Sequence, residues 1–312
     1  MPAHLSKSQQ DLIYKQKHMK LLASEPVTAI LGGEEFTLQH VDRTKGAIPK
    51  QRASLLEAMK LMKEKKDWDN LPNLLEGLSD AGLSIPLVSV MVIAFASRAG
   101  RQDTIVECLR RVEDTKFALD NARIASRCML AMQLKAVNSD WDSKETRKAL
   151  AWAEQIAMMM EDPKHSRNVV LGGPDDPRIQ PQVLGALLQL AAVRALKFQD
   201  GKDDDGKVLQ YAERLLSLPA SFEGPKVPLL SEKGKTRRDT AKIRSTWLAL
   251  HAPIWYGLTV ARTILGASSP LSTKINATAK HLQGLIDTSV SKLTTEAPRS
   301  KSVELYQKLA KL

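Results

Sequence analysis

The chain has 312 residues, enough for one large domain or two ordinary ones whose hydrophobic core needs no disulfide or metal to hold it. Hydrophobic residues make up 43% and charged residues 26% of the sequence, which excludes a disordered, collagen-like or purely coiled-coil protein. Lysine and arginine number 46 against 35 aspartates and glutamates, so the net charge of +11 predicts an anionic partner.

The positive charge is concentrated at the two ends of the sequence. The formal charge is +5 over residues 1–66, −4 over residues 67–225 and +10 over residues 226–312. Aromatic residues make up only 4%, which counts against a β-rich fold and against binding through many stacked rings. We therefore expect the ends, rather than the middle, to contact phosphate.

Residues 1–50 are predicted to form a basic N-terminal arm that is partly extended. A short helix candidate carries Lys15, Lys17 and Lys20, which are candidate RNA-binding residues. Residues 27–31 and 36–41 have extended character on either side of a pair of glycines. The same segment is equally typical of a weak organelle-targeting signal and of an arm that docks on a partner, and both interpretations stay open.

From residue 51 onward, apolar residues recur at helical spacing almost without interruption. Over residues 51–161 the helices form pairs related by an offset of about 34 residues. The offset superposes Leu71 on Ile105 and Leu75 on Leu109. Such a period predicts helical hairpins stacked as an α-solenoid, in which each pair buries its apolar face against its neighbours.

The predicted fold is all-α, with four segments along the chain. These are the extended arm over 1–50, the helical repeats over 51–161, helices joined by long Pro/Gly-rich loops over 162–235, and a basic C-terminal helical bundle over 236–312. The bundle is expected to contain helices near 237–252, 253–265 and 272–293 and a short last helix from Ser300. No segment has the roughly 20 apolar residues of a membrane span.

The repeat region resembles a known family. Residues 89–120 contain a first helix, a glycine at its end, and a second helix that leads into an aspartate, and this unit is similar to a pentatricopeptide repeat. A further recurrence supports a third unit, since Asp67-Trp68-Asp69 returns as Asp140-Trp141-Asp142. The region looks like divergent pentatricopeptide or tetratricopeptide repeats. Joined to basic ends, such repeats also resemble helical-repeat proteins specific to mitochondrial ribosomes.

The strongest candidate RNA-binding patch lies at residues 233–244. Its six cations accompany a single aspartate, Asp239, and follow a proline-rich segment that would present them to a polyanion. The cations are Lys233, Lys235, Arg237, Arg238, Lys242 and Arg244. Trp247, His251 and Trp255 follow at intervals of four residues. We interpret the two tryptophans as core residues, although stacking on a base is the alternative.

The sequence offers no metal site, cofactor site or catalytic motif. Residues 201–207 almost match a phosphate-binding loop, but their three consecutive aspartates would repel a phosphate, so we interpret them as a solvated turn between helices. Cys108 and Cys128 lie in apolar helical stretches and are predicted to be buried small hydrophobes. We expect a protein that is not an enzyme and takes no small-molecule substrate.

The function expected from the charge pattern and the resemblance is structural. The chain would be an RNA-associated component of the mitochondrial ribosome in the matrix, with its basic ends on rRNA and its helical body on neighbouring ribosomal proteins. One alternative is a pentatricopeptide-type factor for the processing or stability of organellar RNA, which would show sequence preference among RNA oligomers. The other is a helical-repeat adaptor that binds proteins without nucleic acid.

Overall fold

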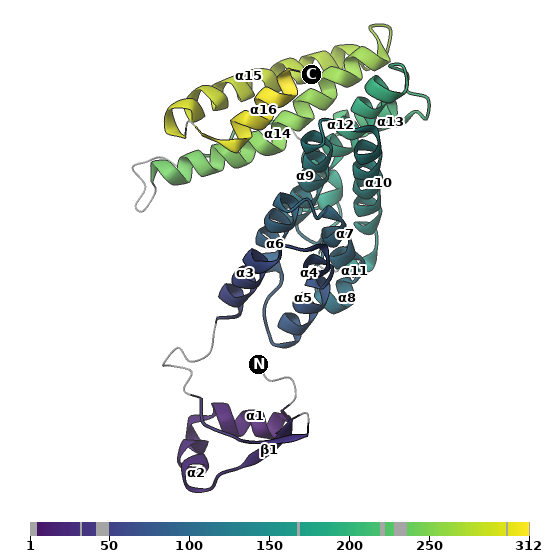
Figure 1. Cartoon of the computed structure of the whole chain (residues 1–312). Helices are drawn as coiled ribbons and strands as arrows, with labels where there is room; N and C mark the ends of the chain where they lie inside the picture. The colour runs from purple at the N-terminus through teal and green to yellow at the C-terminus, as the bar shows by residue number, and fades with distance from the viewer. Residues whose placement is uncertain are drawn as a thin grey trace. The chain divides into compact units, whose positions relative to one another are not determined.

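The computed structural model describes residues 5–31, 33–41, 50–166, 169–218, 222–227, 236–297 and 299–311. Over these ranges the fold is helical apart from one two-stranded hairpin (Figure 1), which confirms the predicted all-α class. The chain divides into two compact units, the first made of Met1–Asp67 with Gly77–Leu83 and the second of Trp68–Glu76 with Ser84–Leu312. The four-segment division predicted from the sequence stays a prediction.

The first unit begins with a small folded module that has its own apolar core. It contains α1 (Lys7–Tyr14), η1 (Gln16–His18), α2 (Met19–Ser24) and an antiparallel hairpin of β1 (Thr28–Leu31) and β2 (Glu34–Thr37). A capping box between Ser6 and Gln9 starts α1. The buried residues of the module are Leu5, Ile13, Leu22, Ala29 and Leu38. The predicted extended segments thus pair with each other, and a hydrophobic cluster holds the hairpin against the helices.

The remaining helices follow one another with short connections. The first unit also contains α3 (Gln51–Leu61), and the two units divide within α4 (Lys65–Asp69) and α5 (Leu71–Asp80). The second unit then contains α6 (Pro86–Arg98), α7 (Gln102–Arg110), α8 (Val112–Thr115), α9 (Ala122–Asn138), α10 (Ser143–Met159), α11 (Pro163–Ser166), η3 (Pro177–Ile179), α12 (Pro181–Phe198), α13 (Lys207–Leu216), α14 (Arg237–Leu265), α15 (Ser272–Glu296) and α16 (Lys301–Ala310).

Helix α12 is the centre of the second unit. It packs against α9, α10, α13 and α14, while α14 in turn packs against α15 and α16. All residues from Val183 to Val193 are buried, as expected for a helix that is apolar all round. The approach to α14 is close, because a Cβ added at Gly257 would lie 2.9 Å from the Cα of Gln189. Glycine at this position therefore allows α12 and α14 to pack this closely.

The positions that define the predicted repeat are buried, but its recurrent tripeptide is not a structural repeat. Leu71, Leu75, Ile105 and Leu109 all have 0% exposure, so the apolar positions match at the predicted offset. Asp67-Trp68-Asp69 lies within α4, whereas Asp140 and Trp141 have positive φ values of 51° and 63°. Asp142 then caps α10 by accepting a hydrogen bond from the backbone of Glu145. Both tryptophans are buried, yet in different backbone conformations.

One helix replaces two that the sequence predicts in the C-terminal part. The predicted break between residues 252 and 253 is wrong, because α14 continues through Pro253 to Leu265. Proline removes one helical hydrogen bond, which usually ends or kinks a helix. Here Ile254 and Leu258 are fully buried where α14 packs against its neighbours, and this burial offsets the loss. The predicted helices from 272 and from Ser300 correspond to α15 and α16.

Candidate nucleic-acid interface

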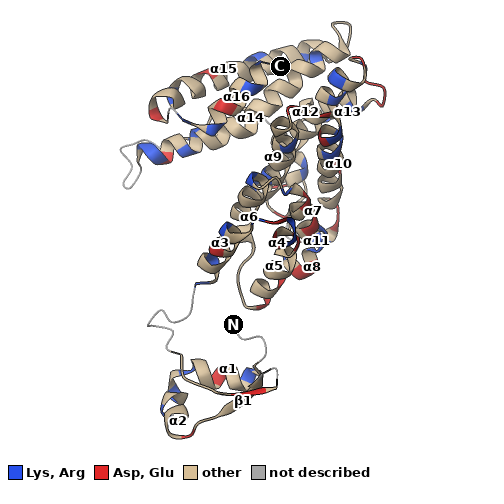
Figure 2. Cartoon of the chain, in the orientation of Figure 1, with Lys and Arg blue, Asp and Glu red and all other residues tan. Residues whose placement is uncertain are grey.

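The start of α14 carries the exposed part of the predicted basic patch. Arg237, Arg238 and Lys242 are all exposed, and the start of this helix carries the blue of Lys and Arg positions in Figure 2. None of the three forms an ion pair with any residue that the structure describes. Lys233 and Lys235 lie outside the described residues. Three cations on two successive turns are therefore available to a polyanion.

The N-terminus of α14 is closed by its own capping box and carries two arginines in the first turn. Thr236 and Asp239 form a capping box, in which the Asp239 carboxylate accepts hydrogen bonds from the backbone N–H and the hydroxyl of Thr236. The positive end of the helix macrodipole lies at the same place. Arg237 and Arg238 in the first turn add like charge to this end, which disfavours the free helix and favours a bound phosphate.

Arg244 lies where α14 is covered by α15, unlike the three exposed cations. Its side chain is only 15% exposed and its Nε lies 3.3 Å from Oε2 of Glu296 on α15. Ala241 and Leu248, which share this face in the helical pattern, are both buried. Of the predicted patch, Arg244 is thus a packed ion-pair residue that joins α14 to α15, and the exposed patch is narrower than the sequence predicts.

The three predicted N-terminal lysines differ in whether they form an ion pair. Lys17 and Lys20 are exposed and form no ion pair with a described residue. The Nζ of Lys15 lies 2.5 Å from Oδ2 of Asp11, one turn earlier on α1, and both side chains are about half exposed. An exposed pair of this kind is weak, so it competes little with a phosphate. Of the three predicted lysines, Lys17 and Lys20 are thus the two that form no ion pair with a described residue.

The aromatic residues after the patch belong to the core. Trp247 is 8% exposed and stacks on His251 with ring centroids 4.3 Å apart, and its Nε1 donates to the carbonyl of Glu223. His251 is also buried, and this burial lowers its pKa to about 4. Trp255 is half-buried and its ring lies 5.5 Å from that of Tyr306 on α16. The core interpretation is confirmed for Trp247, whereas Trp255 is half-buried beside Tyr306.

The loop that resembles a phosphate-binding motif is closed by its own carboxylates. The Asp203 carboxylate accepts hydrogen bonds from the backbone N–H groups of Val208 and Leu209 at 3.0 and 2.9 Å, at the start of α13. Asp205 receives two hydrogen bonds from Arg194. The N-terminus that would hold a phosphate is therefore occupied by a protein carboxylate, which confirms the interpretation of residues 201–207 as a turn between helices.

Other classes of site find no support in the part of the chain that the structure describes. Over those ranges no three His, Cys, Asp or Glu side chains gather closely enough to hold a metal ion. Within the same ranges, no helix combines the length and the apolar character needed to cross a membrane. Cys108 and Cys128 are free and buried, and burial raises the pKa of Cys108 to about 12. Their interpretation as small buried hydrophobes is confirmed.

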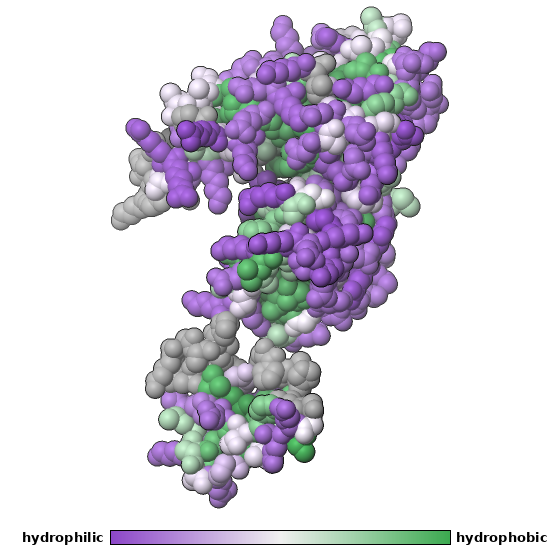
Figure 3. All heavy atoms as spheres, in the orientation of Figure 1, coloured by the Kyte–Doolittle hydropathy of each residue, from purple (hydrophilic) through white to green (hydrophobic). Residues whose placement is uncertain are grey.

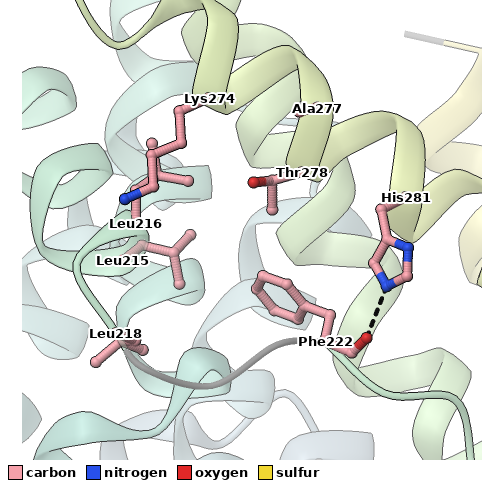
Figure 4. A pocket seen from close by; sticks show the side chains of 8 residues that line it. All are labelled: Leu215, Leu216, Leu218, Phe222, Lys274, Ala277, Thr278 and His281. Carbon is pink, nitrogen blue, oxygen red and sulfur yellow. Dashed lines mark hydrogen bonds between the residues drawn. The ribbon is translucent and has the colours of Figure 1, made fainter.

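A pocket of about 270 Å³ lies between α13 and α15 (Figure 4). Its walls are mostly apolar, with Leu215 and Phe222 facing Thr278 across it. His281 is engaged, because its Nε2 donates to the carbonyl oxygen of Phe222 at 2.8 Å. Among the described residues of the lining, Lys274 is the charged one. Such walls suit an apolar side chain rather than a phosphate or a metal ion.

Comparison with known sequences identifies the family. The family described as mitochondrial ribosomal protein mS27 (Mrp13) matches residues 1–309. The chain belongs to the mitochondrial ribosomal protein mS27 family. A relative from Neurospora crassa, the small ribosomal subunit protein mS27, is 27% identical over 234 residues. This match covers 70% of the chain and 59% of the relative, so the chain spans about three fifths of that protein's length.

Membership of the mS27 family agrees with the expected class of ribosomal protein. Sequence reasoning missed one half-buried cation, Arg127. Arg127 on α9 lines a groove of the second unit and makes no ion pair with a described residue. Burial lowers the pKa of its guanidinium, and Arg123 nearby contributes to the same direction. No local pattern marks Arg127, because the groove is formed by helices far apart in the sequence.

Proposed function

We propose that this member of the mS27 family is a structural component of the small subunit of the mitochondrial ribosome, acting in the mitochondrial matrix without catalysing a reaction. The family match over residues 1–309 carries the proposal, and the relative from Neurospora is named as a protein of the small subunit. This match does not favour an RNA-processing factor or an adaptor without nucleic acid. Its partners are rRNA and neighbouring ribosomal proteins.

In this proposal the basic ends hold the protein on rRNA. Arg237, Arg238 and Lys242 bind phosphates at the start of α14, and Lys233 and Lys235 extend this contact. Lys17 and Lys20 make a second contact, to which Lys15 contributes when its pair with Asp11 opens. Support comes from the exposure of the described cations and from the charge of −4 over residues 67–225. Cations without a protein partner can neutralise RNA phosphates, and so release the counterions condensed on the RNA, without first breaking an ion pair.

The helical body supplies the protein contacts. Its hairpins over residues 51–161 are divergent repeats of the pentatricopeptide or tetratricopeptide type, which is supported by the shared burial of Leu71, Ile105, Leu75 and Leu109. Repeats of this kind offer extended helical surfaces for binding. Because the middle of the sequence is slightly acidic, RNA phosphate is a poorer partner for this body than protein.

Sedimentation tests the proposed function. Mitochondria that contain the tagged chain are lysed, the extract is separated on a sucrose gradient, and each fraction is analysed by mass spectrometry. The chain is expected to sediment with the small subunit, and nuclease treatment is expected to release it together with small-subunit proteins. A peak at the top of the gradient, or a nuclease-resistant complex without ribosomal proteins, would contradict the proposal.

The RNA contact at α14 is tested by charge reversal. The triple variant Arg237→Glu, Arg238→Glu, Lys242→Glu is expected to bind an rRNA fragment more weakly and to reduce the slope of log K against log salt by about 2 to 3, about one for each lost phosphate contact. Fluorescence anisotropy at several salt concentrations measures both quantities. The glutamates that the variant introduces in the first turn of α14 interact favourably with the positive end of the helix dipole, so α14 is expected to stay folded.

A matched control separates local contact from net charge. The variant Lys144→Glu, Lys197→Glu, Lys202→Glu makes the same change in net charge at exposed lysines of the acidic middle segment. Its affinity and salt slope are expected to stay close to those of the wild type. Equal losses in the two variants would show that RNA senses only the total charge and would remove the assignment of the α14 patch.

A further inference from the structure

The second unit contains a groove that its own core leaves open. Four helices, α6, α9, α14 and α16, surround a space of about 600 Å³. Its floor is apolar and includes Ile93, Leu130, Leu134 and Leu305. Figure 3 shows hydrophobic side chains at the surface where α6 lies. This volume is large enough for several apolar side chains of a partner.

A cation without a counter-ion lies in the wall of this groove. The described contacts of Arg127 include one hydrogen bond, from Nη2 to the hydroxyl of Thr246 at 3.2 Å, and no carboxylate within ion-pair distance. Its guanidinium has five N–H donors, so most of its capacity is unused. A half-buried charge with no partner costs free energy. A carboxylate that entered the groove would recover part of that cost.

The rim of the groove is also positively charged. Arg98 and Lys301 line the groove, are exposed, and form no ion pair with a described residue. Lys308 is held by Asp140 at 2.6 Å and by the carbonyl of Val137. Among the described residues that line the groove, Glu304 is the one carboxylate. Arg98, Arg127 and Lys301, which form no ion pair with a described residue, outnumber Glu304 in the lining. The groove is therefore positively charged, although the net charge over residues 67–225 is −4.

We propose that this groove binds an amphipathic helix of a neighbouring ribosomal protein, whose apolar side chains fill the floor while an Asp or Glu pairs with Arg127. This proposal rests on the proposed function in one respect, which is that the partner is a ribosomal protein. A helix with apolar residues at i, i+3 or i+4, and i+7 matches a groove between helices. Acidic residues beside that stripe complement Arg98 and Lys301.

The floor favours protein over RNA as the occupant. Ribose and phosphate would lose hydration against Ile93, Leu130 and Leu305 without gaining hydrogen bonds there. The lining contains no aromatic side chain on which a base could stack. Apolar side chains gain from the same burial. The arginine then adds direction and specificity to a contact that the apolar floor stabilises.

Photo-crosslinking in intact mitochondria tests the inference. Benzoylphenylalanine is placed at Ala94 in the groove or, as a control, at Leu87, a residue of α6 that is 75% exposed and does not line it. Crosslinks from Ala94 are expected to map to one protein segment with helical apolar spacing and an Asp or Glu beside it. Adding Arg127→Gln is expected to lower this yield about fivefold or more, as for a lost charge-assisted pair.

Two further variants serve as controls for the effect of Arg127→Gln. Arg123→Gln changes an exposed arginine on the same helix that does not line the groove, and is expected to keep the yield. Lys301→Gln, at an exposed rim position, is expected to lower it about twofold, and it removes no buried group. Arg127→Gln should not lower the melting temperature of the purified chain, because it removes an uncompensated charge.

Several results would overturn the inference. These are a crosslink from Ala94 to rRNA, a crosslink to a segment without acidic residues, a yield at Ala94 no higher than background, or a yield that Arg127→Gln leaves unchanged. Gradient fractions of the same samples show separately whether the chain sediments with the small subunit. The gradient can therefore contradict the proposed function while the crosslinks support the groove contact, and the crosslinks can contradict the groove contact while the gradient supports the proposed function.

Discussion

At the scale of single residues, His251 shows how burial fixes a charge state. Its Nδ1 lies 2.8 Å from the carbonyl oxygen of Trp247, so this nitrogen carries the proton and donates it. Its Nε2 lies 3.2 Å from the side-chain nitrogen of Gln182 and accepts from it. Both ring nitrogens are therefore used by the neutral form. Burial between α12 and α14 disfavours the imidazolium and lowers the pKa to about 4.

This shift makes stability depend on pH. The unfolded chain binds a proton at His251 with an ordinary pKa of about 6.5, whereas the folded chain does so only near 4. As pH falls from about 6.5 to about 4, the unfolded state gains more protons, so the free energy of unfolding decreases by about 3 kcal/mol from this residue. Between pH 7 and 5 the loss is about 2 kcal/mol.

Urea unfolding at pH 7 and pH 5 measures the effect. The variant His251→Gln does not titrate in this range, so its loss of stability between the two pH values is expected to be about 2 kcal/mol smaller than that of the wild type. His281→Gln is the matched control, because His281 lies on the surface of α15. A pH dependence that His251→Gln leaves intact would show that other groups produce it.

The same residues show what sequence reasoning can reach. The periodicity around Trp247 predicts a core position because apolar residues surround it at helical spacing. It does not distinguish Arg238 from Arg244, since both occur in one basic run. The difference comes from Glu296, on a helix 52 positions further along the chain, which pairs with Arg244. A local pattern gives the faces of a helix, and only the tertiary fold decides which face is covered.

At the scale of elements, the crossing of α12 and α14 depends on two glycines. A Cβ at Gly185 would lie 2.6 Å from Cγ1 of Ile254, and one at Gly257 would meet the backbone of Gln189 at 2.9 Å. The contact at Ile254 involves the branch point of a stiff side chain, and the contact at Gln189 involves backbone, which cannot move without shifting a helix. Sequence reasoning treats a glycine inside a helix as a weak point, because the facing helix is not visible in the local pattern.

Alanine at Gly257 is therefore expected to destabilise the chain. Its methyl group must push α12 and α14 apart, at a cost of about 1–3 kcal/mol typical of overpacking. This outweighs the gain in helix propensity of up to about 1 kcal/mol. Thermal or chemical unfolding measures the difference.

Gly284→Ala is the control for the helix propensity itself. Gly284 lies in α15 and has no atom within 4 Å of the position of an added Cβ. Alanine there is expected to raise the free energy of unfolding by about 0.5–1 kcal/mol. If both variants were stabilised alike, the close approach of α12 and α14 would not constrain the fold.

At the scale of the whole molecule, the sequence predicts a basic arm where the structure has a folded module. Residues 5–41 have extended segments and lysines, as the sequence indicates, but a cluster of five buried apolar residues joins hairpin and helices. These residues are spread over the segment, so neither strand nor helix periodicity reveals them. Lys17 and Lys20 are thus presented by a defined surface rather than by a free chain.

The module is expected to unfold without the helical body when its core is weakened. Leu22→Ala removes a side chain that is 7% exposed, at a cost of about 2–5 kcal/mol, which is large for so small a core. Hydrogen exchange of the full chain should then show faster exchange in β1 and β2 and unchanged protection in α12. Leu21→Ala, at a neighbouring position that is 41% exposed, should alter neither. Loss of protection in α12 with Leu22→Ala would show instead that the two units fold as one cooperative body.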